Sequence, residues 1–180
     1  MKVYHNHYYH IYNRTNAHET AFRTRENYGH FLKKYRTLAE NIFETIAYCL
    51  MPTHFHFLVR VSTEETSTTG AVLGKILSSY TQGFNRYWSR HGSLFQQHTK
   101  AICVDDERYL LALLAYIHNN PVRAGLVALP EEWEFSSYQD YCDLRNGTLP
   151  NKQLVHDYFP SVQAFREFSV QQAEQPEFWV

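Results

Sequence analysis

Residues 51–59, MPTHFHFLV, place two histidines two positions apart, at His54 and His56. The stretch has the composition of a β-strand, in which alternate side chains share a face. The imidazoles would then lie on one face, roughly 7 Å apart, while Phe55 and Phe57 point into the core. Two such imidazoles can bind one divalent cation. Because the chain has 11 histidines, about 0.7 pairs of this kind arise by chance, so coincidence remains an equal alternative.

A second group of reactive side chains lies in YIHNNPVRAGLV, residues 116–127. The helix that contains it is predicted from an apolar stripe at helical spacing, formed by Leu110, Leu113, Leu114 and Ile117. Tyr116 and Asn120 are one turn and ~40° apart, so they share a flank beside the core face. A tyrosine there can act as a nucleophile, or it can be an ordinary residue at the border of an amphipathic helix. His118 lies on the opposite flank and is a weaker partner for Tyr116.

The elements that position these groups follow from periodicity and turn residues. Strands are predicted at residues 7–14, 43–50 and 54–61, an extended segment at 94–104, and helices at 25–40, 71–90 and from Asp105 or Asp106 to about Asn119. Pro121 is expected to end the last helix, because a proline pushes the preceding residue out of helical geometry. The order β-α-β-β-α-β predicts an α+β, ferredoxin-like antiparallel sheet, with an additional C-terminal helix carrying the tyrosine.

The chain of 180 residues is expected to form mainly one domain. Residues 1–127 carry both groups, and residues 128–180 are predicted to be a C-terminal extension that packs on or beside them. Neither an apolar run long enough to span a bilayer nor a signal-peptide pattern is present. The three cysteines form no CxxC pair, which favours a reducing, cytoplasmic location.

Charge is distributed unevenly along the chain. The net charge of −1 by itself argues against nucleic-acid binding, but residues 1–104 hold 12 Lys/Arg against 6 Asp/Glu. Residues 66–104 contain no acidic residue, so this part is a candidate surface for a polyanion, or simply a solvated helix face. The candidate contacts to nucleic-acid backbone and bases are Asn13, Arg14, Lys75, Arg86, Tyr87, Trp88, Arg90 and Lys100. Tyr80 is expected to belong to the core.

The two groups occur together with other recognisable stretches in a fixed order. These are YHIYNR at residues 9–14, FNRYWSRHGSLFQQ at 84–97 and WEFSSY at 133–138. In this combination the chain resembles the single-tyrosine HUH transposases, most closely their REP-associated tyrosine transposase branch. HUH denotes His-hydrophobic-His, here His54-Phe55-His56, and the resemblance runs from about residue 8 to 140.

The resemblance implies metal-dependent cleavage and transfer of single-stranded DNA through a 5′-phosphotyrosine, on hairpin-forming repeats. Tyr116 matches the nucleophile, His54 and His56 match the metal ligands, and Asn120 matches a position that supplies a further ligand. The expected cofactor is Mg²⁺ or Mn²⁺. Thr53 stands where this branch usually has asparagine, and we expect it to tune the turn without affecting the chemistry.

Other interpretations remain open at this stage. The chain could be a non-catalytic DNA-binding regulator derived from a transposase, although the intact set of reactive residues argues against decay. A small metallohydrolase unrelated to DNA would have to explain the basic segment. The resemblance favours a monomer over a homodimer. No general base is identified, and His118 is a weak candidate.

Overall fold

The computed structural model describes residues 2–173, and the element order follows the expectation from the sequence. The elements that matter for the site are, in chain order, β1 (Tyr8–Arg14), α1 (Arg25–Ala39), β2 (Phe43–Met51), β3 (His54–Val61), α2 (Thr69–Tyr87), β4 (Lys100–Val104) and α3 (Glu107–Arg123). They are followed by α4 (Tyr138–Tyr141), α5 (Gln153–Tyr158) and α6 (Val162–Ala173). None of the helices in this part of the chain combines the length and apolar character needed to cross a bilayer.

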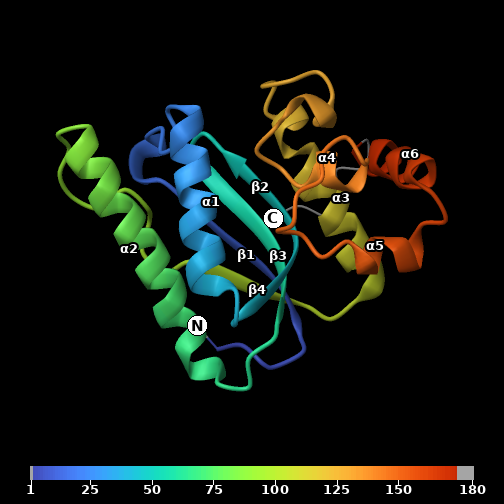
Figure 1. Ribbon diagram of the computed structural model, residues 1–180, viewed down its shortest axis with the longest axis horizontal. Helices are drawn as coiled ribbons and strands as arrows, with labels where there is room; N and C mark the ends of the chain where they lie inside the picture. The colour runs from blue at the N-terminus through green and yellow to red at the C-terminus, as the bar shows by residue number, and fades with distance from the viewer. Residues whose placement is uncertain (1, 174–180) are drawn as a thin grey trace.

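Four strands of the described chain form an antiparallel sheet in the order β2-β3-β1-β4. This order, with the β-α-β-β-α-β sequence of elements, confirms the predicted ferredoxin-like fold. Helices α1 and α2 cover one face of the sheet, and α3 lies on the other side with α4, α5 and α6 (Figure 1). The sheet therefore has a helical layer on each side, and the tyrosine-bearing helix belongs to the second layer.

Strand alternation separates the side chains of the sheet into two sets. Phe55, Phe57 and Val59 of β3 pack in the core that includes α1 and α2, as predicted. Leu58 points the other way, into the core that α3 shares with the C-terminal helices. His54 and His56 have the parity of Leu58, so alternation places them on the α3 side.

The last helix extends beyond the proline that was expected to end it. Pro121 lies inside α3, which continues to Arg123, so that prediction is wrong. The ending is a Schellman motif: Gly125 N–H donates to the Val122 carbonyl, and the Leu126 N–H donates to the Pro121 carbonyl. Gly125 has φ +67°, a left-handed conformation that favours glycine. Because the helix continues, Asn120 keeps helical geometry one turn after Tyr116.

The segment before β4 is only partly extended. The strand covers 100–104 and not the whole of 94–104, and α2 ends at Tyr87, before the predicted boundary near residue 90. Side-chain hydrogen bonds connect the segment to β1 and to the turn that follows it. Asn13 donates from Nδ2 to the Gln96 carbonyl and to Thr99 Oγ1, each at 3.0 Å. Backbone bonds also hold the segment, because the Gln96 N–H donates to the Arg14 carbonyl and Phe95 forms an isolated bridge with Thr15.

The C-terminal extension packs against the outer edge of β2 and against α3. The Leu50 N–H donates to the Phe135 carbonyl, and Trp133 donates from Nε1 to the Leu50 carbonyl. On α3, His118 Nε2 and Ser137 Oγ are hydrogen-bonded at 2.7 Å. The extension thus links the edge of the sheet to the helix that carries Tyr116.

His118 should make the stability of the fold sensitive to acid. Burial lowers its pKa from 6.5 to about 3, so the folded chain excludes a proton that the unfolded chain takes up below about pH 6.5. The free energy of unfolding should therefore fall by about 2 kcal/mol between pH 7 and pH 5 because of this group. Urea unfolding of wild type and His118→Gln at both pH values measures the difference.

The exposed His156 provides a matched control, since His156→Gln makes the same exchange without removing a buried side chain. If His118→Gln became less stable by the same amount as wild type between the two pH values, the buried neutral imidazole would not be the source.

Candidate functional site

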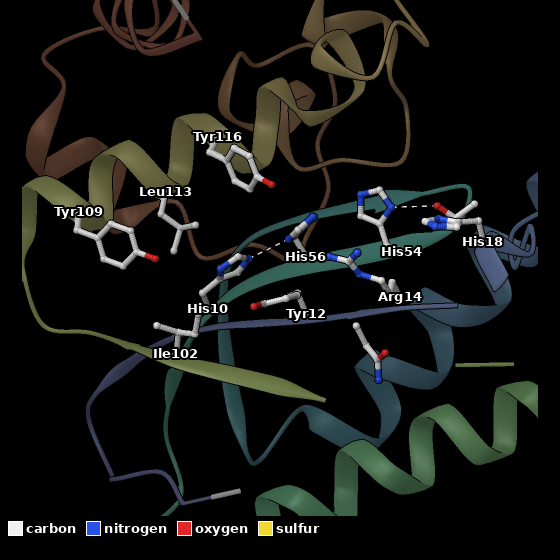
Figure 2. A pocket seen from close by; sticks show the side chains of 12 residues that line it. His10, Tyr12, Arg14, His18, His54, His56, Ile102, Tyr109, Leu113 and Tyr116 are labelled. Carbon is white, nitrogen blue, oxygen red and sulfur yellow. Dashed lines mark hydrogen bonds between the residues drawn. The ribbon is translucent and has the colours of Figure 1, made fainter. Parts of the chain in front are cut away.

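A cavity of about 250 Å³ opens between the sheet and α3, at the side where β3 begins. Figure 2 shows side chains from both layers converging on it: His10, Tyr12 and Arg14 from β1, His54 and His56 from β3, and Tyr109, Leu113 and Tyr116 from α3. His18, in the turn after β1, lies beyond His54. Residues more than 60 positions apart in the sequence thus line one cavity.

The register of the sheet explains this convergence. Residues directly opposite in an antiparallel pair point to the same face. Tyr12 is opposite His56, and Arg14 is opposite His54. On the other edge of β1, Lys100 of β4 is opposite Tyr12. A row of aromatic, imidazole and basic side chains is therefore built across three strands on the face toward α3.

His56 is almost fully buried, and its two ring nitrogens have different surroundings. Nδ1 is hydrogen-bonded to His10 Nε2 at 2.9 Å. Nε2 has no hydrogen-bond partner within residues 2–173. A buried polar nitrogen without a partner is uncommon in folded proteins, and a water molecule, an ion or a ligand can satisfy it.

His54 has a similar arrangement. Its Nδ1 is 3.1 Å from Thr53 Oγ1, and its ring lies 5.1 Å from that of His56, nearly perpendicular to it. The Asn120 side chain acts on His54 by raising the pKa of its imidazole, while Asn120 Nδ2 has no hydrogen-bond partner in the described part of the chain. Thr53 therefore contacts one of the imidazoles directly, and the expectation that it tunes the turn without affecting the chemistry stays a prediction.

Tyr116 faces the imidazoles from α3. Its ring centroid is 5.5 Å from that of His56, in an edge-to-face arrangement, and 6.5 Å from that of His10. The Arg123 guanidinium lies 5.8 Å from the centre of the Tyr116 ring. The tyrosine and both histidines that the sequence singled out are therefore neighbours within one chain (Figure 2).

Burial keeps the imidazoles of the site neutral. It is the main cause that lowers the pKa of His54 and places the pKa of His56 well below its usual range, with Arg14 adding to both effects. The pKa of His10 falls to about 4 for the same reason. A neutral imidazole is the form that binds a metal ion. The site thus favours the ligand form of both histidines near neutral pH.

The donor set suits a divalent cation. His56 offers a buried nitrogen without a partner, His54 lies beside it, and Asn120 brings an amide whose oxygen is a metal ligand of ordinary type. Nitrogen and amide-oxygen donors together fit Mn²⁺, and with lower affinity Mg²⁺. Within residues 2–173, no three His, Cys, Asp or Glu side chains come together in a group that could hold a metal ion.

Some of the predicted basic contacts lie at the cavity and others do not. Arg14 lines it, and Lys100 is exposed on the same face of the sheet. Lys75, Arg86 and Tyr87 are exposed on α2, across the sheet from the site (Figure 1). Tyr87 has 76% of its surface exposed and could stack on a base only at that separate surface. The predicted basic set is therefore divided between two layers.

Other residues predicted to contact DNA make contacts with other residues of this chain. Asn13 is buried and uses its amide group to hold residues 96–99. The Arg90 guanidinium pairs with Glu19 at 2.7 Å. Trp88 is half-buried, with the Arg23 guanidinium 4.8 Å from its ring centre. Their contacts support the fold, and a role in DNA binding stays a prediction.

Several residues of the cavity were not predicted from the sequence. His10, Tyr12, His18 and Tyr109 all line it. Alternation along YYHIYNR places His10, Tyr12 and Arg14 on one face, but the register between β1 and β3 was needed to bring that face to His56. His118, the weak candidate for a general base, is fully buried against Ser137, so that assignment is wrong.

The ferredoxin-like sheet, with a His-hydrophobic-His pair facing a helical tyrosine, is the arrangement of the single-tyrosine HUH transposases that the sequence resembles. The comparison with protein families agrees. The model of the IS200-like transposase family matches residues 3–120, and the chain belongs to this family.

Individual relatives point to one branch of the family. A Haemophilus influenzae protein assigned as a REP-associated tyrosine transposase is 26% identical over 118 residues, which cover 60% of this chain and 66% of that protein's length. A solved REP-associated tyrosine transposase, bound to a REP hairpin, has a TM-score of 0.62 and 17% identity. The match covers 84% of this chain and 92% of that one, and it shows a common fold.

Proposed function

We propose that this chain cleaves and rejoins single-stranded DNA beside hairpin-forming repeats, with Tyr116 as the nucleophile and a divalent metal as cofactor. The observation that carries the proposal is the position of Tyr116, whose ring lies 5.5 Å from that of His56 inside the cavity that His54 also lines. A nucleophile and a set of metal ligands in one cavity match the needs of phosphodiester transfer.

The reaction proceeds on the Tyr116 side chain. Its hydroxyl oxygen attacks the phosphorus of the scissile phosphate, and the bond between phosphorus and the 3′ oxygen breaks. The phenolic proton passes to solvent, and the departing 3′ oxygen takes up a proton. The 5′ phosphate stays linked to Tyr116, which conserves the bond energy, so a later attack by a 3′ hydroxyl reseals a strand without ATP.

His54, His56 and Asn120 would hold the metal ion. When bound, the cation supplies Lewis-acid polarisation of the scissile phosphate. The chain itself contributes orientation: β3 presents both imidazoles, and α3 presents Asn120 one turn after Tyr116. Arg14 and Lys100, on the same face of the sheet, would contact the phosphates on either side.

The substrate class follows from the relatives. The solved relative is a complex with a REP hairpin, and we extend this specificity to the present chain. We further propose that residues 1–127 form the catalytic domain and that 128–180 are the extension that supports α3, with residues 174–180 outside the described structure. Because Tyr116 and the histidines meet within one chain, we propose that a monomer is sufficient for cleavage.

Replacement of the nucleophile should abolish the covalent intermediate. Wild-type protein incubated with Mn²⁺ and a hairpin carrying single-stranded flanks, taken from repeats beside the gene, should give a protein–DNA adduct on a denaturing gel. Tyr116→Phe should give none, because the variant lacks the hydroxyl oxygen that we propose attacks the phosphate. Tyr158→Phe, on α5 and not among the residues that line the cavity, is the control and should form the adduct like wild type.

Tyr12 and Tyr109 line the same cavity and are the alternative nucleophiles. An adduct that survives Tyr116→Phe but disappears in Tyr12→Phe or Tyr109→Phe would overturn the assignment. Salt-sensitive binding of the hairpin by wild type, with no adduct under Mn²⁺ or Mg²⁺, would identify a non-catalytic DNA-binding regulator instead.

Removal of a metal ligand should weaken cation binding directly. His56→Ala should raise the dissociation constant for Mn²⁺ by more than about 100-fold, beyond the 10- to 100-fold typical when only a hydrogen-bond partner of a ligand is removed. Calorimetric titration in the absence of DNA measures this constant. His91→Ala removes an exposed histidine that is not among the residues lining the cavity, and it should leave the dissociation constant for Mn²⁺ unchanged. Equal affinities in the two variants would exclude His56 as a ligand.

The basic side chains at the cavity should contribute to DNA binding by neutralising phosphates. Arg14→Gln and Lys100→Gln should each reduce the slope of log affinity against log salt by roughly 0.7 to 0.9, the value for one phosphate that is no longer neutralised. Lys75→Gln, exposed on α2 in the opposite layer, is the matched control for charge and should keep the slope. Fluorescence anisotropy across a salt series, without metal, gives the slopes. A reduction only in Lys75→Gln would place the DNA on the α2 surface.

A further inference from the structure

His10 lies directly beside His56 and contacts the nitrogen that faces away from the proposed metal position. It is 7% exposed, and its ring stacks on that of His56 with centroids 5.1 Å apart. The hydrogen bond joins His10 Nε2 to His56 Nδ1 at 2.9 Å. Figure 2 shows this bond on the sheet side of the cavity, with Tyr116 on the other side. One ring nitrogen of His56 is therefore hydrogen-bonded to His10, and the other has no partner within residues 2–173.

The hydrogen bond can have only one direction if His56 binds a cation. A neutral imidazole carries one proton, and the nitrogen that coordinates a metal must be the one without it. If Nδ1 donates to His10, then Nε2 keeps its lone pair directed into the cavity. If His10 donates instead, His56 Nε2 carries the proton and becomes a buried donor with no acceptor in residues 2–173.

We propose that His10 is a positioning residue that fixes His56 in the Nδ1–H tautomer and so presents Nε2 to the cation, an inference that rests on the proposed metal site. His10 accepts the proton of His56 Nδ1 and holds the ring plane. A hydrogen bond to the outer nitrogen of a ligating histidine sets both its tautomer and its basicity. In this role His10 acts through His56 and does not need to contact the DNA.

The location of His10 makes it suitable for this role. It lies on β1, which is hydrogen-bonded to β3 on one edge and to β4 on the other, so its backbone is fixed from both sides. Rigid elements hold such supporting groups more accurately than loops do. Thr53 contacts the corresponding nitrogen of His54, but its hydroxyl can donate or accept and so selects neither tautomer. His10 Nε2 can also donate or accept, and it accepts from His56 when the proton of His10 is on Nδ1.

The tautomer can be observed in wild-type protein without metal or DNA. With ¹⁵N-labelled histidine, long-range proton–nitrogen spectra distinguish a protonated from an unprotonated ring nitrogen, and the His56 signals are those missing from His56→Asn. We expect a protonated Nδ1 and an unprotonated Nε2. The reverse pattern would overturn the proposal, and this measurement needs no variant of His10.

Cation affinity tests the same assignment by a second route. His10→Leu fills the space without an acceptor, and the dissociation constant for Mn²⁺ should rise by about 10- to 100-fold. His10→Gln restores an acceptor oxygen near the position of Nε2 and should recover most of the affinity. His118→Gln, at a buried histidine away from the cavity, controls for a general decrease in stability and should bind Mn²⁺ like wild type.

The outcomes separate this inference from the proposed function. Wild-type affinity for Mn²⁺ in His10→Leu, or equal decreases in His10→Leu and His10→Gln, would show that His10 does not act through its acceptor nitrogen, while the metal site itself would stand. Failure of wild type to bind Mn²⁺ would remove the metal site, and an Nδ1–H tautomer in that protein would still confirm the direction of the hydrogen bond.

Discussion

The antiparallel register between β1 and β3 is the constraint on which the site depends. It sets Tyr12 opposite His56 and Arg14 opposite His54, and alternation then sends all four side chains to the face that α3 covers. A shift of one residue would turn the imidazoles into the layer of α1 and α2 and bring phenylalanines to the cavity. The apolar residues of β3, packed in the core with α1 and α2, oppose that shift. The chemistry of one face is therefore maintained by the packing of the other.

The second requirement is the placement of α3 over the sheet. Leu110, Leu113, Leu114 and Ile117 bury its apolar stripe against β2, β3 and the C-terminal helices. His118 and Ser137 add a buried hydrogen bond on the far side of the helix. Tyr116 lies on the other flank of the stripe from His118, so both contacts fix the helix that carries it. The extension after residue 127, which lies beyond the segment matched by the family model, thus helps to hold the helix that carries Tyr116.

The sequence allowed the element order and the key triad to be predicted, because alternation and helical spacing are local properties. His54, His56 and Tyr116 were identified by type and spacing, and the resemblance to a family connected them. Contacts between residues far apart in the sequence could not be predicted. Arg90 and Glu19 are 71 positions apart, and His10 contacts His56 only because of the sheet register. The end of α3 was mispredicted for a different reason. Pro121 lacks an N–H, but its carbonyl accepts the bond that closes the helix, so the proline belongs to the ending without causing it.

The contact between the C-terminal extension and β2 also affects how the protein behaves at high concentration. Residues 135–137 lie along the outer edge of β2, where Ser136 forms a bridge to Cys49 and the Ser137 N–H donates to the Tyr48 carbonyl. These bonds occupy backbone groups that an uncovered edge strand would offer to a second sheet. The opposite edge, β4, is five residues long and begins with the exposed Lys100. A short, charged strand on one side and a covered strand on the other protect the sheet from edge-to-edge aggregation.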